Sequence, residues 1–197
     1  MAELTRCPWP GSDPLYVAYH DEEWGVPKID ARALFEKLVL EGFQAGLSWI
    51  TILRKRPAFR EAFDGFDAEA MARYGERKIA SLLKNDGIIR HRGKIEAAVS
   101  NARAFLDIEA DQGFSRFVWS FVGGEPEQHA YSTMRDIPPQ TDASKQLAKA
   151  LKSRLDLQDT HMEALASVVG DLKQVILDTV ANGSGASLRA EMEGAVS

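Results

Sequence analysis

The helical spacing of apolar residues is the feature that most restricts what this chain can fold into. Leu34, Leu38 and Val39 follow Asp30 at helical spacing, which predicts a helix that Asp30 caps. Gly42 or Gly46 ends or bends this helix. Further patterns predict helices over 47–56, 57–63, 67–74, 76–84, 93 to about 108 and 142–154. Pro57 closes the helix over 47–56, and Asp142 caps the helix over 142–154. Strict apolar–polar alternation is nearly absent, so the sequence predicts an all-α fold.

Length and composition indicate a soluble globular protein of one domain or two small lobes. The chain has 197 residues, of which 45% are hydrophobic and 27% charged. Its longest uncharged apolar run, 42–53, is too short to span a bilayer, and the N-terminus lacks the apolar core of a signal peptide. The single cysteine, Cys7, cannot support an internal disulfide framework. We therefore expect a cytoplasmic protein without a membrane association.

The net charge of −5 is concentrated in the C-terminal segment. Residues 155–197 hold seven acids against two bases, and an apolar stripe over 162–180 predicts an amphipathic helix followed by a loose end. This stripe could form a dimer interface or bind a partner. The first 154 residues are neutral overall, with one basic cluster over 54–60 and another over 84–103. These clusters are either phosphate-binding patches or solvated helix faces.

Two helices joined by a short, basic hairpin are predicted between residues 84 and 95. Glycines flank the hairpin at Gly87 and Gly93, and the segment carries Arg90, Arg92 and Lys94. Backbone N–H groups at the start of the second helix can approach a phosphate while nearby cations supply charge. The pattern therefore indicates a sequence-independent grip on DNA, although other helical turns with two glycines look similar.

Two other segments place aromatic and charged side chains among small residues. In residues 41–50 the carboxylate of Glu41 and the indole of Trp49 flank glycines that leave room either for a flat ligand or for a close helix crossing. The N-terminal region combines Cys7, Trp9 and His20 with neighbouring tyrosines and tryptophans. This crowding is typical of a ligand pocket, but capping of the core would explain it equally well.

Together these segments resemble the DNA-3-methyladenine glycosylase I family of the helix-hairpin-helix glycosylase superfamily. The resemblance runs from Arg6 through Arg154 and is carried, in the family's order, by DPLYVAYHDEEWGVP, LEGFQAGLSWITIL, GIIRHRGKI and FVWSFV. It implies two helical lobes with the damaged base of double-stranded DNA flipped into a pocket between them. Residues 1–154 would form the glycosylase-like domain, with its hairpin at about 84–95, and 155–197 a divergent tail.

The resemblance also implies roles for individual residues. Glu41 would read the Watson–Crick edge of the base, Trp49 and Tyr19 would stack on it, and Trp9 would lie nearby. An N3-methylated purine is a cation with a weakened glycosidic bond, and electron-rich rings with one carboxylate suit such a ligand. The implied DNA contacts lie in the hairpin: Arg90, Arg92, Gly93 and Lys94.

Lys94 has two interpretations. It lies close to where bifunctional relatives keep a lysine that attacks the sugar to form a Schiff base. We expect a phosphate contact instead, as in a monofunctional hydrolase that leaves an abasic site. A different class of function also stays open, in which the substituted tail prevents turnover and leaves a non-catalytic damage- or DNA-binding module.

Zinc is a point of departure from the family pattern. Members usually bind a structural zinc through an N-terminal cysteine and histidine, which Cys7 and His20 match, and a second pair near the C-terminus. That second pair is missing here, because the chain has no other cysteine and the only histidine beyond residue 154 is His161. A structural zinc needs four ligands. We therefore expect no intact zinc site and no required cofactor.

Overall fold

The computed structural model describes residues 6–126, 138 and 140–154. The regular elements are α1 (Pro14–Glu22), α2 (Ala31–Gln44), α3 (Trp49–Ala62), η1 (Asp64–Phe66), α4 (Ala68–Ala72), α5 (Glu76–Leu82), α6 (Arg92–Gln112), α7 (Phe114–Trp119), η2 (Ser120–Val122) and α8 (Asp142–Arg154). No strand occurs in these residues, so the predicted all-α fold is confirmed. None of these helices is long and apolar enough to cross a bilayer.

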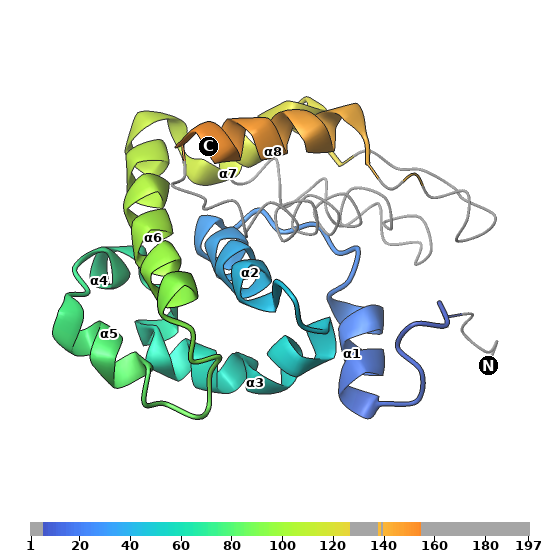
Figure 1. Ribbon diagram of the computed structural model, residues 1–197. Coiled ribbons are helices and arrows are strands. Elements are labelled where there is room, and N and C mark those ends of the chain that lie inside the picture. The colour runs from blue at the N-terminus through green and yellow to red at the C-terminus, as the bar shows by residue number, and fades with distance from the viewer. Residues whose placement is uncertain (1–5, 127–137, 139, 155–197) are drawn as a thin grey trace.

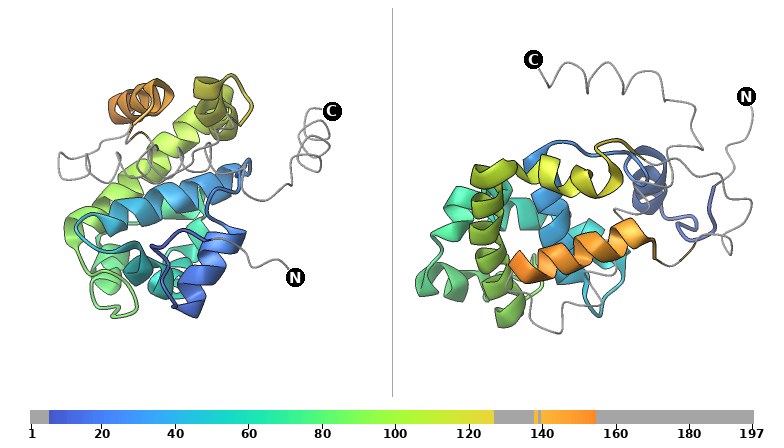
Figure 2. Two further views of the ribbon diagram at one scale, coloured as in Figure 1. Left: turned by 90° about the vertical axis from the view of Figure 1, so that its right-hand side faces the viewer. Right: turned by 90° about the horizontal axis from the view of Figure 1, so that it is seen from above.

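Helix α2 runs through the middle of the molecule, and the other helices surround it (Figure 1). It packs against α3, α6 and α7, while α4 and α5 pack against α6. Helix α1 lies against α3, and α8 lies against η2 (Figure 2). Because α1, α2 and α3 meet near the N-terminal end of α3, side chains from three separate segments converge there.

Aromatic rings fill the core. Phe43, Phe59 and Phe63 are fully buried and form a chain with ring centroids 4.7 and 6.0 Å apart. On the other side of α2, Phe35 contacts Phe105 with a centroid distance of 4.7 Å. Near the end of the described core, Phe114, Phe117 and Trp119 are buried, whereas Phe121 is only half-buried. These rings hold α2 in place from both sides.

Most predicted helices are present, but two of their ends are placed differently. Pro57 does not close a helix, because α3 continues through it to Ala62. The backbone bond that proline removes costs up to about 3 kcal/mol, and burial of Phe59 and Ala62 on the last turn opposes that cost. Helix α2 passes Gly42 and ends at Gln44, two residues before Gly46, so of the two glycines predicted to end it Gly46 is the one at its end, with a φ of +78°. Asp142 is inside α8; Thr141 caps it through a reciprocal pair of hydrogen bonds with Ser144 of 3.1 and 3.0 Å.

The predicted hairpin lies between α5 and α6. The Gly87 N–H donates to Asn85 Oδ1 at 2.9 Å, which closes the turn after α5. Gly87 passes close to α3, where an added Cβ would come within 2.9 Å of Ala58 Cβ. Lys55 of α3 donates from Nζ to the carbonyls of Asp86 and Gly87 at 2.8 and 3.3 Å. The hairpin is therefore fastened to the helix that begins at Trp49.

A long-range hydrogen bond connects the loop after α1 to α7. Trp119 Nε1 donates to the backbone carbonyl of Lys28 at 3.0 Å, between positions 91 residues apart. The Trp119 ring is 6% exposed, so this bond is shielded from water. It fixes one wall of the pocket described next.

Candidate active site

Three side chains from three helices form a cage where α1, α2 and α3 meet. Glu41, in the last turns of α2, is completely buried. Trp49 begins α3, and its ring lies 5.5 Å from the ring of Tyr19 on α1, centroid to centroid. The structure thus brings together the three residues that the sequence predicted for base recognition. A buried carboxylate between electron-rich rings is an environment suited to a planar cation.

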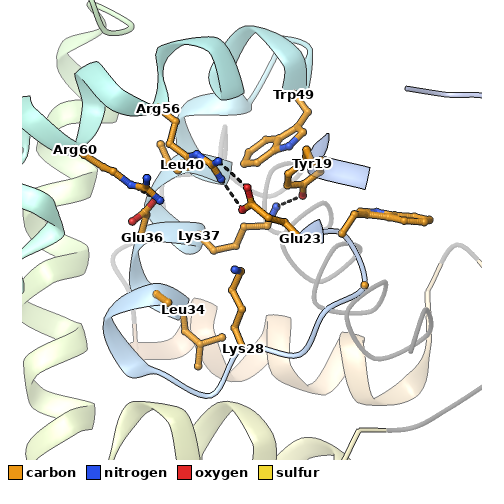
Figure 3. Close-up of a pocket in the computed structure, with 13 residues that line it drawn as sticks. Tyr19, Glu23, Lys28, Leu34, Glu36, Lys37, Leu40, Trp49, Arg56 and Arg60 are labelled. Atoms are coloured by element: carbon orange, nitrogen blue, oxygen red, sulfur yellow. Dashed lines mark hydrogen bonds and ion pairs between the residues drawn. The ribbon is translucent and has the colours of Figure 1, made fainter. Parts of the chain in front are cut away.

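Lys37 places its ammonium group inside this cage. Its Nζ lies 3.8 Å from the centroid of the Trp49 ring and 2.5 Å from Glu41 Oε1. It also donates to Tyr19 Oη at 3.0 Å (Figure 3). Lys37 is one turn before Glu41 on α2, and its side chain is 13% exposed. The cage of the free protein therefore already holds one positive charge.

A pocket opens beside the cage, is lined in part by the cage residues Tyr19, Lys37 and Trp49, and is bordered by ion pairs. Arg56 donates to both oxygens of Glu23 at 2.6 and 2.7 Å, and Arg60 donates to Glu36 at 2.9 Å (Figure 3). Burial alone would raise the pKa of Glu23, but the hydrogen bonds and charge of Arg56 outweigh it and hold the pKa of this carboxyl below its usual range. These pairs fix α1 and α2 to α3 around the cage.

Trp9 is part of an aromatic cluster that covers the outer side of Tyr19. The ring of Trp9 lies 6.4 Å from Tyr19, 4.7 Å from Tyr16 and 5.1 Å from Trp24, centroid to centroid. Trp9 thus lies near the cage, as predicted, but behind Tyr19.

In the cage itself, Trp49 Nε1 is buried and has no hydrogen-bond partner among the described residues. An acceptor atom on a ligand could satisfy this donor.

Cys7 and His20, the two zinc ligands that the family resemblance implies, lie next to each other. His20 Nε2 accepts a long hydrogen bond of 3.4 Å from the Cys7 backbone N–H, and Nδ1 lies 2.9 Å from Asp21. Hydrogen bonds from Arg6 and His20 lower the pKa of Asp21 to about 2. The described part of the chain contains no group of three metal-ligating side chains. Cys7 and His20 alone do not make up the four-ligand set of a structural zinc.

The basic cluster over 54–60 is occupied by internal contacts. Arg54 pairs with Asp13 at 2.6 Å, and the other three cations bind Glu23, Glu36 and the hairpin carbonyls, as described above. The sequence left open whether this cluster is a phosphate-binding patch or a solvated helix face. Because its cations are paired within the protein, the structure does not favour a phosphate-binding patch. The cluster instead attaches α3 to its neighbours.

The hairpin residues differ in how free they are to meet a phosphate. Arg90 is exposed and makes no ion pair or hydrogen bond with any described residue. Arg92 is paired with Glu76 at 2.8 Å and with Glu96 at 3.1 Å, all three on the surface. Gly93 lies in the first turn of α6, where N–H groups without helical partners point outward. Arg90 is thus the more available of the two arginines.

Lys94 is directed inward. Its Nζ donates to the carbonyls of Phe43 and Ala45 at 2.9 and 2.6 Å, at the end of α2. Burial lowers the pKa of this amine, which remains hydrogen-bonded to both carbonyls. The predicted phosphate contact is not made by this conformation. Lys94 instead connects the start of the hairpin helix to the helix that carries Glu41.

Comparison with known proteins agrees with this geometry. A family model described as methyladenine glycosylase matches residues 9–155. The chain belongs to the methyladenine glycosylase family. It is 51% identical over 152 residues to "DNA-3-methyladenine glycosylase 1" of Escherichia coli, covering 77% of this chain and 81% of the relative. It is 50% identical over 151 residues to "DNA-3-methyladenine glycosylase" of Haemophilus influenzae, covering 76% and 82%.

The fold of this methyladenine glycosylase also matches solved structures. A 3-methyladenine DNA glycosylase I from Staphylococcus aureus, described for its recognition of 3-methyladenine, superposes with a TM-score of 0.81 at 36% identity. The alignment covers 89% of this chain and 93% of the other. The family resemblance and the fold predicted from the sequence are therefore confirmed.

Sequence reasoning missed Lys37 and the Glu23–Arg56 pair. A lysine four residues before a glutamate is an ordinary pattern of exposed helix surfaces, so the spacing of Lys37 and Glu41 gave no sign of a buried site. Glu23 and Arg56 are 33 positions apart, and no periodicity relates them. Both pairs are recognisable only once α1, α2 and α3 are placed together.

Proposed function

We propose that this methyladenine glycosylase excises 3-methyladenine from alkylated double-stranded DNA. The observation that carries the proposal is the cage of Glu41, Tyr19 and Trp49, which holds a cation between a buried carboxylate and two rings. A purine methylated at N3 is a planar cation of the kind that such a cage stabilises. The base must leave the helical stack to reach it.

The proposed chemistry is hydrolysis of the N-glycosidic bond. The positive charge on the base weakens this bond, so the protein has to supply mainly positioning, exclusion of water from the base and electrostatic help. Glu41 would hold the base through its polar edge while Trp49 and Tyr19 contact its faces. Water adds to the sugar carbon and loses a proton, and the electron pair of the broken bond stays on the departing base.

The placement of Lys94 supports a monofunctional reaction. A Schiff-base mechanism needs a free amine that reaches the sugar, whereas this amine donates to two carbonyls at the end of α2. Borohydride treatment of enzyme and methylated duplex should therefore trap no covalent complex. A trapped complex that disappears in Lys94→Met would establish the bifunctional alternative.

We propose that DNA binds along the hairpin, with Arg90 and the N–H groups near Gly93 at phosphates. The exposed Arg90 and the start of the 21-residue helix α6 support this placement. Arg92 would also contact a phosphate once its ion pairs with Glu76 and Glu96 break. Lys94 would act by positioning the hairpin. In this proposal residues 1–154 form the catalytic unit, a cytoplasmic enzyme that needs no metal or cofactor.

The deciding experiment is the release of free base from duplex DNA methylated beforehand. The purified chain, in excess and at low salt, should release 3-methyladenine well above the spontaneous rate. Low salt is needed because phosphate contacts weaken steeply as ionic strength rises. Tight binding without release would establish the alternative of a non-catalytic binding module. The predicted partner-binding stripe over 162–180 lies outside the described residues.

A further inference from the structure

Lys37 occupies the space that a stacked base would need. Its ammonium lies 3.8 Å from the centre of the Trp49 ring, a separation typical of van der Waals contact. It lies 5.4 Å from the centre of the Tyr19 ring and within hydrogen-bond distance of Tyr19 Oη. A base in contact with this face of Trp49 and with Glu41 would overlap the ammonium group. The base and Lys37 therefore exclude each other from the cage.

The charges in the cage give a reason for a lysine there. The Glu41 carboxylate is completely buried, and a buried charge without a counter-charge is strongly destabilising. In the free protein Lys37 supplies that counter-charge at 2.5 Å. An alkylated purine brings its own positive charge, so it can take over this role when Lys37 leaves. A neutral purine brings no such charge, so it competes with the Lys37 ammonium less well and displaces it only at higher concentration.

We infer that Lys37 is an internal substitute for the cationic base, and that the two exchange in the cage during each catalytic cycle. This inference rests on the proposed function of the site. It assigns Lys37 the role of a positioning residue that sets which ligands enter. Because an occupied cage is unavailable, an ammonium that fills it nine-tenths of the time weakens the apparent affinity of a competing ligand about tenfold.

The exchange also bears on product release. When the bond between the sugar and the base breaks, the electron pair moves to the base, which becomes neutral 3-methyladenine. The neutral base no longer offers Glu41 a positive charge, and return of the Lys37 ammonium supplies one. Lys37 therefore competes more strongly with the neutral product than with the cationic substrate, which favours departure of the product.

When the Lys37 side chain leaves the cage, it can enter the pocket beside the cage. Its side chain lines the pocket beside the cage, which Glu23 and Glu36 also line (Figure 3). A rotation of the flexible side chain toward these carboxylates keeps the ammonium near negative charge and in contact with solvent.

The first test measures the affinity of free 3-methyladenine by calorimetry. Lys37→Met keeps an apolar side chain of similar length but removes the competing cation, so it should bind 3-methyladenine about tenfold more tightly, which corresponds to about 1.4 kcal/mol. Lys78→Met is the matched control, because Lys78 also lies over a ring and beside a carboxylate, at 4.8 Å from Tyr74 and 3.5 Å from Asp64. The control should bind like the parent protein.

A folded Lys37→Met protein that binds 3-methyladenine no more tightly than the parent would overturn the inference, because a purely structural lysine weakens the site when it is removed. The same variant should show inhibition of excision at lower concentrations of added 3-methyladenine. Both affinity measurements use the free base, so they stand apart from activity. If the parent protein releases no base, the proposed function fails, whatever the affinities show.

The second test uses the unchanged protein and decides the matter even if Lys37→Met does not fold. A lysine this close to the Trp49 ring should show a ring-shifted NMR signal for its ε-methylene group, assigned by its loss in Lys37→Arg. Saturation with 3-methyladenine should move this signal to the position of ordinary lysines. A signal that keeps its ring shift while the base is bound would show that Lys37 stays in the cage.

Discussion

In the proposed function, recognition of the base depends most on Glu41. Its carboxylate is the one negative charge that the described residues place in the cage, and Lys37 neutralises it in the free protein. Glutamine at this position keeps the size and an acceptor atom but lacks the charge that favours a cation. The difference between the two side chains therefore isolates the electrostatic part of recognition.

Glu41→Gln should lower kcat/KM for excision of 3-methyladenine from methylated duplex by about 10- to 100-fold, because a hydrogen bond to a charged group is lost at about 1.5–3 kcal/mol. The measurement is excision under single-turnover conditions, with a thermal melt to confirm folding. The affinity for undamaged duplex should stay unchanged, since this contact is to the base. Equal excision by a folded Glu41→Gln protein would remove Glu41 from the site.

The Glu23–Arg56 pair should make stability depend on pH. The folded-state pKa of Glu23 is held below its ordinary value of 4.5, so the pair stabilises the fold above that pH and is lost as the pH falls through the lowered pKa. Glu23→Gln should therefore lower the melting temperature at pH 7, and its difference from the parent protein should shrink below pH 4.5. A difference that is constant between pH 7 and pH 3 would contradict this coupling.

Individual site residues were predictable where the residue type itself carries the chemistry. Glu41, Trp49 and Tyr19 were predicted by resemblance, and the structure places them together. Lys94 was predicted to face phosphate because its sequence context is basic, but the carbonyls that hold it belong to residues about 50 positions away. A contact of that kind depends on tertiary packing, which local sequence does not reveal.

At the level of secondary structure, the two arginines of the hairpin provide a test of how DNA is held. Arg90→Ala should weaken binding to methylated and undamaged duplexes by a similar factor, because phosphate contacts carry no base information. Arg92→Ala should have a smaller effect, since Arg92 must first leave Glu76 and Glu96. Binding measured over a series of salt concentrations should show a smaller salt dependence for Arg90→Ala. Loss of discrimination at unchanged affinity would place Arg90 at the base instead.

Helix positions were predicted well and helix ends less well. Asp30 caps its helix as predicted, because a side-chain acceptor before a helix acts locally, with a bond of 2.7 Å. Asp67, which was predicted as the first residue of its helix, caps that helix instead with a bond of 2.9 Å. Pro57 was wrong as a helix end, since burial of the following aromatic turn in the core opposes the loss of one backbone bond. Local rules fail where long-range packing is stronger than a backbone preference.

For the whole molecule, the absence of a second ligand pair leads to a prediction about metal. Protein purified without metal supplements should contain well under one zinc per chain, and a chelator should leave the melting temperature unchanged. The reason is that Cys7 and His20 supply at most two of the four ligands that a structural zinc needs. Stoichiometric zinc that chelators remove with loss of stability would show that other side chains complete the site.

The hydrogen bond from Trp119 to the Lys28 carbonyl has a consequence for how the enzyme is made. It joins the early loop that borders the pocket to a helix synthesised 91 residues later. A nascent chain emerges N-terminus first, so α1, α2 and α3 are outside the ribosome well before Trp119 follows them. During that interval the pocket wall lacks its fastening. The wall of the pocket is thus fastened only after α7 has been synthesised.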